Sequence, residues 1–223
     1  MVKTANYFTL QNQDQKIKEW KETIFSQVRD RKHLKLQPPK AALLVVDMIN
    51  YFASPKGGAW LPATTALVQN LQLLLAAWRA HRLPVVFTRH CHHNREETGM
   101  LGKFYRDYIS CGGYSARIID EFPLFPEDKV IRKTTYDAFY QTELREFLEE
   151  KKVKQVLVTG VMTNLCCETT ARNAFVKGFE VYFPVDGSCT ASENLHLASL
   201  LNLASGFARL TDIGEVVNCL NRL

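Results

Sequence analysis

Short, continuous apolar runs alternate with segments of helical periodicity from residue 41 onward. A strand that is apolar at every position is covered on both faces, which is typical of a parallel sheet between helices. The runs lie at residues 41–46, 84–88, 129–132, 155–159, 180–185 and 208–211. The pattern therefore predicts an α/β fold, with one doubly wound domain whose mostly parallel, six-stranded sheet carries helices on both faces.

The segments between these runs carry apolar residues at helical spacing. Pro62 suits the first turn of a helix in which Leu67, Leu71 and Trp78 share one face. Further helices are expected at residues 142–151, 164–177, 192–204 and 213–220. Residues 91–120 remain as a long loop, and a loop of that length is usually a lid, a binding loop or an oligomer contact.

The positive charge of the chain lies at its N-terminus. The formal charge is +5, and residues 1–40 hold nine Lys or Arg against four Asp or Glu, which leaves 19 of each sign in residues 41–223. We therefore expect a solvated basic N-terminal extension, residues 1–40, that contains an amphipathic stretch at 17–28 and precedes a neutral domain, residues 41–223. Nucleic-acid binding is not predicted, because no basic stripe is interleaved with aromatic residues.

The chain contains neither a membrane-span pattern nor a secretory-signal pattern. No apolar run approaches the roughly 18 to 20 residues that a span needs, and the N-terminal residues lack a continuous apolar segment. We therefore expect a cytoplasmic protein without membrane contact. In that compartment the six cysteines, which show no zinc-ligand spacing, are expected to be free thiols. They are Cys91, Cys111, Cys166, Cys167, Cys189 and Cys219.

Three chemically active side chains follow predicted strands. Asp47 follows the first strand, Lys133 the third and Cys166 the fourth. In an open parallel sheet the ligand binds beyond the carboxyl ends of the strands. The sequence therefore predicts that these three side chains lie together at one edge of the sheet.

These residue types suit nucleophilic catalysis. Cys166 lies in the first turn of an expected helix, where unpaired N–H groups and the helix dipole favour a thiolate. Asp47 can accept the thiol proton and Lys133 can orient that carboxylate, while N–H groups at the helix start can bind an oxyanion. The trio predicts acyl transfer through a covalent thioester. A helix-capping aspartate, a solvated lysine and a core cysteine are the alternatives that spacing leaves open.

Four sequence blocks resemble the isochorismatase-like cysteine hydrolases, a family that includes nicotinamidases, N-carbamoylsarcosine amidohydrolases, ureido-acid and biuret-type hydrolases, and isochorismatases. The blocks are AALLVVDMINYF (41–52), VIRKTTYDAFYQTEL (130–144), VLVTGVMTNLCCETTARNAFVKGFEV (156–181) and VDGSCTASENLHLASL (185–200). The resemblance covers about residues 40–215. It implies a Rossmann-like fold, a catalytic triad of Asp47, Lys133 and Cys166, and a homo-oligomer, either a dimer or a tetramer.

The resemblance also implies how an oxyanion would be bound. Family members have a cis peptide four residues before the nucleophile, which here is the Val161–Met162 bond. It turns the amide of the Met162 position toward the substrate. The oxyanion hole is therefore expected from the backbone N–H groups of Met162 and Cys166.

The family resemblance sorts among reactions as well. Isochorismatases cleave a vinyl ether without a nucleophilic cysteine and, like this chain, have an N-terminal extension, but they usually carry a small residue at the position of Cys166. The retained thiol favours a cysteine amidohydrolase that cleaves an amide, ureido or carbamoyl C–N bond of a small non-peptide substrate. Vinyl-ether hydrolysis and a catalytically silent, ligand-binding member remain as alternatives.

A histidine cluster at residues 90–93 invites comparison with the metal site of nicotinamidases, which consists of an Asp-x-His and a further His. His92 matches the family's histidine, whereas His90 replaces the carboxylate. Metal-free carbamoyl-type members resemble this segment more closely. We therefore expect no metal and no other cofactor. If a metal binds, His90 and His92 are the candidate ligands. A structural or substrate-contacting role is favoured for these histidines.

Several side chains flank the predicted site and are candidates for contact with a small-molecule substrate. An apolar wall with a polar handle, or ordinary core packing, would suit Asn50, Phe52, Trp60, Tyr136 and Phe139. Arg89, together with Arg95 and Arg106 near the long loop, can recognise a carboxylate by bidentate contact, which would favour a ureido or carbamoyl acid.

Overall fold

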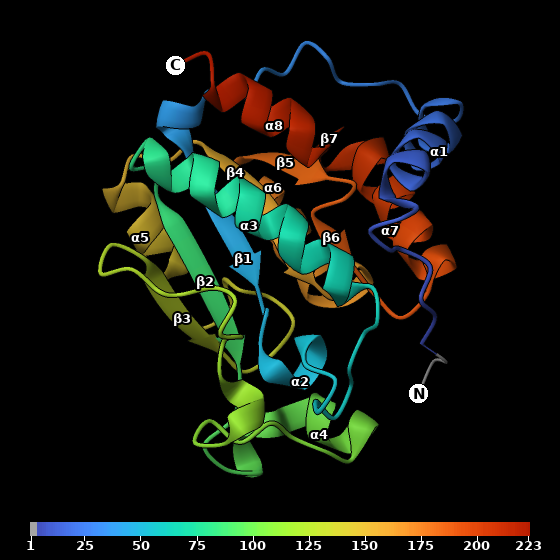
Figure 1. Cartoon of the computed structure of the whole chain (residues 1–223). Helices are drawn as coiled ribbons and strands as arrows, with labels where there is room; N and C mark the ends of the chain where they lie inside the picture. The colour runs from blue at the N-terminus through green and yellow to red at the C-terminus, as the bar shows by residue number, and fades with distance from the viewer. Residues whose placement is uncertain (1–3) are drawn as a thin grey trace.

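A computed structural model describes residues 4–223, and its centre is one parallel sheet (Figure 1). The strands are β1 (Ala41–Val46), β2 (Val85–His90), β3 (Lys129–Lys133), β4 (Gln155–Val161), β5 (Glu180–Pro184), β6 (Ser188–Cys189) and β7 (Arg209–Thr211). Their order is β3-β2-β1-β4-β5-β7, with β6 beside β4, and every described pair is parallel. The predicted α/β class is confirmed, and β6, two residues long, adds a seventh strand that is too short for a periodicity.

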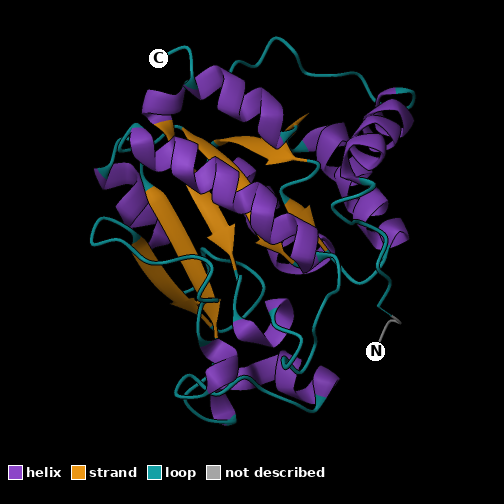
Figure 2. Ribbon diagram, in the orientation of Figure 1, coloured by secondary structure: helices purple, strands orange, loops and turns teal. Residues whose placement is uncertain are grey.

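Helices cover both faces of the sheet, with α3 and α8 side by side on one face and α6 on the other (Figures 1 and 2). The helices are α1 (Gln13–Phe25), α2 (Asn50–Ala53), α3 (Thr64–Ala80), α4 (Gly99–Tyr105), α5 (Leu144–Glu150), α6 (Glu168–Val176), α7 (Glu193–Gly206) and α8 (Ile213–Leu220). Single turns lie at η1 (Pro38–Lys40), η2 (Glu96–Thr98), η3 (Tyr114–Ala116) and η4 (Thr163–Cys167). None of the helices in residues 4–223 is both long and apolar enough to cross a membrane.

Burial along the strands explains why they read as apolar runs. All residues of the central strands β1 and β4 are buried, whereas the edge strand β3 alternates between buried and more exposed positions. Continuous apolar character therefore marks the strands that helices cover on both sides. The segment at residues 91–120, expected as a loop, contains the short helix α4, whose buried apolar contacts are too few for a helical pattern.

The strand order reverses between β1 and β4, because β1 leads to β2 on one side and β4 leads to β5 on the other. This switch point is where open α/β sheets leave a crevice for ligands. Gly160 of β4 lies opposite Val46 of β1 and has a φ of 105°, and a Cβ there would lie 2.1 Å from the Val46 carbonyl oxygen. Glycine therefore permits the close approach of the two strand ends that carry the candidate site.

The N-terminal extension packs on the domain instead of standing free in solvent. Helix α1 contacts α7, and Tyr7, Phe8, Trp20 and Ile24 are buried in the same apolar core as the central strands. The helix covers residues 13–25, whereas the sequence predicts an amphipathic stretch at 17–28. The expectation of a solvated arm is wrong for these aromatic side chains, because their burial depends on α7 at the far end of the chain.

Candidate active site

Three side chains from three strand ends meet at the switch point. Asp47 directly follows β1, Lys133 ends β3, and Cys166 lies in the π-helical turn η4 that follows β4. Nζ of Lys133 lies 2.7 Å from Oδ2 of Asp47 and 3.2 Å from Sγ of Cys166. The structure therefore brings together the trio that the strand ends predict, and all three side chains are buried.

Asp47 is held by its neighbour on β2. The hydroxyl of Thr88 donates to Oδ1 of Asp47 at 2.7 Å and accepts from its backbone N at 3.1 Å. Asp47 has a φ of 48°, a region that aspartate enters more readily than most residues. Thr88 is a positioning residue that the sequence analysis missed, and its only signal is a hydroxyl within an otherwise apolar run.

Lys133 uses its ammonium group on three partners. It donates to the Thr135 carbonyl at 2.8 Å and to Sγ of Cys166, and it pairs with Asp47. Burial alone lowers the pKa of a lysine, but the charges and hydrogen bonds of Asp47 and Cys166 raise the pKa of Lys133 above its ordinary value. The lysine is therefore positively charged and supplies local positive potential.

Cys166 is a neutral thiol in the resting enzyme. Burial raises its pKa to about 12; the Lys133 ammonium acts in the opposite direction, and the Asp47 carboxylate adds to the rise. The sequence-based expectation of a thiolate differs from this result, because it considered the helix start but not the desolvation of the buried sulfur. A base is therefore needed to remove the proton when a substrate binds.

The backbone before Cys166 has an unusual course. The peptide bond between Val161 and Met162 is cis, and the Met162 carbonyl accepts from the N–H groups of Leu165 and Cys167 at 3.1 and 3.2 Å. Cys167 itself is buried, with Sγ 3.7 Å from the Thr159 carbonyl. The turn thus presents Cys166 to the site and directs Cys167 into the core.

The two candidate metal ligands lie beside the trio, and Nδ1 of each is buried without a hydrogen-bond partner. The rings of His90 and His92 are 4.9 Å apart, and Nε2 of His92 lies 2.9 Å from the Thr134 carbonyl and therefore donates to it. Burial and the nearby Lys133 charge lower the pKa of His90 to about 3. Among residues 4–223 no group of three His, Cys, Asp or Glu side chains is placed to hold a metal ion. Two imidazoles without a third such ligand do not fit a tetrahedral site.

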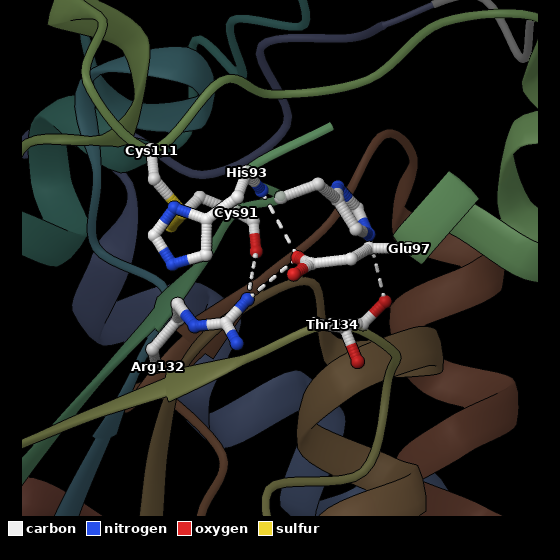
Figure 3. The surroundings of a disulfide bond; sticks show 7 residues. Cys91, His93, Glu97, Cys111, Arg132 and Thr134 are labelled. Atoms are coloured by element: carbon white, nitrogen blue, oxygen red, sulfur yellow. Dashed lines mark hydrogen bonds and ion pairs between the residues drawn. A yellow bond between two sulfur atoms is a disulfide. The ribbon is translucent and has the colours of Figure 1, made fainter. Parts of the chain in front are cut away.

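A disulfide joins the end of β2 to the long loop. Cys91 and Cys111 are bonded, with Cα atoms 4.9 Å apart, which corrects the expectation that all six cysteines are free (Figure 3). Two backbone hydrogen bonds hold the end of the long loop beside the end of β2. The His92 N–H donates to the Ile109 carbonyl, and the His92 carbonyl accepts from the Cys111 N–H. This pairing could not be predicted, because the two cysteines are 20 positions apart and only the folded path of the segment between them brings them together.

Ionic contacts also attach the start of the long loop to β3. Glu97 accepts from the backbone N of His93 and from Arg132 of β3, whose guanidinium also donates to the Cys91 carbonyl (Figure 3). The Cys91 N–H in turn donates to the Lys133 carbonyl at 3.1 Å. The disulfide-bonded loop is therefore attached to the strand that ends at Lys133.

The remaining candidates separate into those beside the trio and those away from it. Burial, the hydrogen bond with the Tyr105 hydroxyl at 2.9 Å and the charge of Cys166 all raise the pKa of Tyr136. Phe139 stacks on Phe179 in the core, so the structure does not place it with the trio. Core packing explains it instead.

Asn50 and Arg89 make other contacts. Nδ2 of Asn50 donates to the Tyr114 carbonyl, which ties α2 to η3. Arg89 lies between Thr88 and His90, and because side chains alternate along a strand it faces away from the trio. It lines a shallow cavity with Arg117 and Val130 on that other side. Phe52 and Trp60 are half-buried, and Phe52 packs edge-on against Tyr51.

Comparison with known proteins places this architecture in a family. The model of the isochorismatase domain matches residues 41–215. The chain is 45% identical to nicotinamidase 3 of Arabidopsis thaliana over 179 residues, 79% of this chain and 86% of that protein. It is 28% identical to a ureidoacrylate amidohydrolase of Acinetobacter baylyi over 212 residues, 83% of this chain and 85% of that protein.

A solved structure shows the same fold. The cysteine hydrolase from Pseudomonas syringae superposes with a TM-score of 0.82 at 26% sequence identity, over 87% of this chain and 97% of that one. The region that the family model matches, residues 41–215, contains the seven described strands and the positions of Asp47, Lys133 and Cys166. The chain therefore belongs to the isochorismatase-like hydrolase family, as its sequence blocks predict.

Proposed function

We propose that this hydrolase is a cysteine amidohydrolase that cleaves an amide, ureido or carbamoyl C–N bond of a small non-peptide substrate. The observation that carries the proposal is the buried contact of a carboxylate, an ammonium and a thiol: Nζ of Lys133 lies within 3.2 Å of both Asp47 and Cys166. Two relatives, a nicotinamidase and an amidohydrolase by name, support the bond type.

The reaction begins with proton transfer. Asp47 takes the proton of the Cys166 thiol as the sulfur attacks the substrate carbonyl carbon, and the charge of Lys133 stabilises the developing thiolate. A C–S bond forms and the carbonyl oxygen becomes an oxyanion. The backbone N–H groups of Met162 and Cys166 are the proposed donors to that oxyanion.

Collapse of this intermediate breaks the C–N bond. Protonated Asp47 returns its proton to the leaving amine or ammonia, and the acyl group remains on Cys166 as a thioester. Asp47 then takes a proton from a water molecule that attacks the thioester, the C–S bond breaks, and the thiol is restored with release of the acid. Because burial raises the pKa of Cys166 to about 12, the cycle depends on Asp47 in both halves.

Ammonia release from a panel of amides, ureas and carbamoyl acids tests the proposal. Cys166→Ala is expected to lose at least about 1000-fold in kcat, on the order expected for loss of a nucleophile. Cys167→Ala is the matched control, because it removes the neighbouring buried thiol and is expected to keep kcat within a few-fold. Intact-mass analysis with a slow substrate should show an adduct on Cys166. Activity that survives Cys166→Ala contradicts the covalent mechanism.

The same assays separate the two alternatives. A vinyl-ether hydrolase would release pyruvate from isochorismate, and its activity would survive Cys166→Ala. A silent, ligand-binding member would turn over none of the panel. The buried base beside the buried thiol supports the amidohydrolase over both, because a nucleophilic thiol needs a base to take its proton and neither alternative uses such a thiol.

We also infer that the enzyme is a homo-oligomer. Met100 and Phe104 on α4 are 71% and 77% exposed, and exposed apolar residues on one short helix suit contact with a second copy. Light scattering at micromolar concentration tests this.

A cytoplasmic location is also proposed, and the Cys91–Cys111 disulfide counts against it because cytosolic thiols are kept reduced. A fluorescent fusion to the full chain distinguishes a cytoplasmic location from an oxidising compartment.

A further inference from the structure

We propose that the N-terminal extension is a positioning element of the active site, and that Trp20 and Tyr7 hold the turn that carries Cys166. This inference rests on the proposed role of Cys166 as nucleophile. The extension lies outside the region that the family model matches, residues 41–215, yet α1 lies beside α7 (Figure 1), and α7 contacts the turn η4. Two separate chains of contacts connect it to the turn η4.

The first route begins at the indole of Trp20. This side chain is 1% exposed, and its ring centroid lies 4.6 Å from that of His196 on α7. Its Nε1 donates to Oε1 of Glu193 at 2.8 Å, and Lys16 pairs with the same carboxylate at 3.0 Å. The extension therefore fixes Trp20 against the first turns of α7, with the indole packed against the His196 ring.

His196 carries the route onward to the turn. It is fully buried, and desolvation lowers its pKa to about 4, so the ring is neutral near pH 7. Nε2 lies 3.0 Å from the Val185 carbonyl, which can only accept, so Nε2 carries the hydrogen and Nδ1 accepts. Nδ1 lies 3.0 Å from the Thr163 hydroxyl, which also makes a hydrogen bond with the Ser188 hydroxyl at 3.0 Å. His196 therefore helps to hold the Thr163 side chain, together with Ser188.

The second route begins at Tyr7. Its hydroxyl accepts a hydrogen bond from the backbone N of Thr190 at 3.0 Å. The Thr190 hydroxyl donates to Oδ1 of Asn164 at 2.5 Å. Asn164 follows Thr163 in η4, two residues before Cys166.

Both routes therefore end on adjacent residues of one turn. That turn carries Cys166 and follows Met162, which supplies a proposed oxyanion donor. Positioning errors of about 1 Å at such groups can cost up to about 100-fold in rate. Losing a contact in the arm is thus expected to lower kcat while leaving substrate affinity nearly unchanged.

A pair of Trp20 variants isolates the first route. Trp20→Phe and Trp20→Leu both lose the hydrogen bond to Glu193, but only phenylalanine keeps a ring against His196. We expect Trp20→Leu to lose about 10-fold in kcat with KM changed less than about 2-fold, and Trp20→Phe to retain most of the activity. Adding Trp20→Leu to Thr163→Val should cause no further loss in kcat, because Thr163→Val already removes the hydrogen bond between Thr163 and His196. Equal kcat for both Trp20 variants and the parent overturns the proposal.

Tyr7→Phe tests the second route without removing a ring, so it remains informative if Trp20→Leu does not fold. Its matched control is Tyr182→Phe, because Tyr182 is a buried tyrosine whose hydroxyl contacts Gln155 and Glu180, away from the turn. Tyr7→Phe should lower kcat about 3- to 10-fold, whereas Tyr182→Phe should leave kcat unchanged even if its melting temperature falls. Parallel loss of stability with unchanged kcat in Tyr7→Phe overturns the proposal.

The rate of Cys166 alkylation, measured by peptide mapping, separates this proposal from the proposed function. It reports the environment of the thiol without any substrate. If Cys166→Ala is inactive while the arm variants match the parent in kcat and alkylation rate, only the arm's role is contradicted. If Cys166→Ala remains active, the proposed mechanism fails, and a changed alkylation rate in Trp20→Leu but not in Trp20→Phe still supports the arm.

Discussion

Nζ of Lys133 lies 2.7 Å from Oδ2 of Asp47, and neither side chain is exposed to solvent. The pair joins the ends of β3 and β1, which β2 separates in the sheet. Two charges removed from water stabilise each other only while both are present, because the desolvation penalty of each is offset by the other. This interdependence governs both the stability and the chemistry of the site.

Removing one member of the pair should therefore destabilise the fold. We expect Lys133→Met to lower the free energy of unfolding by about 3 kcal/mol, since it leaves Asp47 buried without its ammonium partner. The double variant Asp47→Asn with Lys133→Met should recover most of that loss and remain inactive. Urea unfolding measured by tryptophan fluorescence checks this, and a double variant no more stable than the single one would show that the pair is not coupled.

Alkylation of Cys166 should respond to the two charges in opposite directions. The Asp47 carboxylate raises the pKa of the thiol and the Lys133 ammonium lowers it. At pH 8 we therefore expect iodoacetamide to modify Cys166 faster in Asp47→Asn than in the parent, although turnover is lost, and more slowly in Lys133→Met. Peptide mapping over pH 7–10 measures both rates. Slower modification in Asp47→Asn would mean that Asp47 already holds the thiol proton in the resting enzyme.

The disulfide should be visible as a thiol count. Without reductant, the denatured chain should expose four thiols, those of Cys166, Cys167, Cys189 and Cys219, and after reduction six. Closing a loop of this length contributes about 3 kcal/mol, so Cys91→Ser should lower stability by a similar amount. Cys219→Ser, at a half-buried thiol outside the disulfide, is the control and should change little. Six thiols before reduction would contradict the bond.

Acid should weaken the fold through His196. Its pKa is about 4 in the folded protein because of desolvation, against about 6.5 in the unfolded chain, so between these values the unfolded state binds more protons. The free energy of unfolding should therefore fall as the pH falls from about 6.5 to about 4, by about 3 kcal/mol from this residue. His196→Gln should flatten that part of the profile, whereas His33→Gln, at an exposed histidine, should not. A parallel slope in all three proteins would exclude His196 as the source.

The local sequence predicts much of the fold. The apolar runs at residues 41–46 and 155–159 match β1 and the first five residues of β4, because a strand covered on both faces must be apolar throughout. Helix α8 begins after Asp212, whose side chain accepts from the Glu215 N–H, as an N-cap signal requires. By contrast, β6 and α4 left no pattern, since two residues and one exposed helix are too little for a periodicity.

The sequence by itself determined which three residues could meet, because parallel strands end at one edge of a sheet and Asp47, Lys133 and Cys166 each follow a strand. Only the tertiary structure decided their protonation, since burial and the distance between charges set the pKa of Cys166. It also decided the Cys91–Cys111 bond and the burial of Trp20 against His196. These contacts join residues far apart in the chain, and no local pattern encodes them.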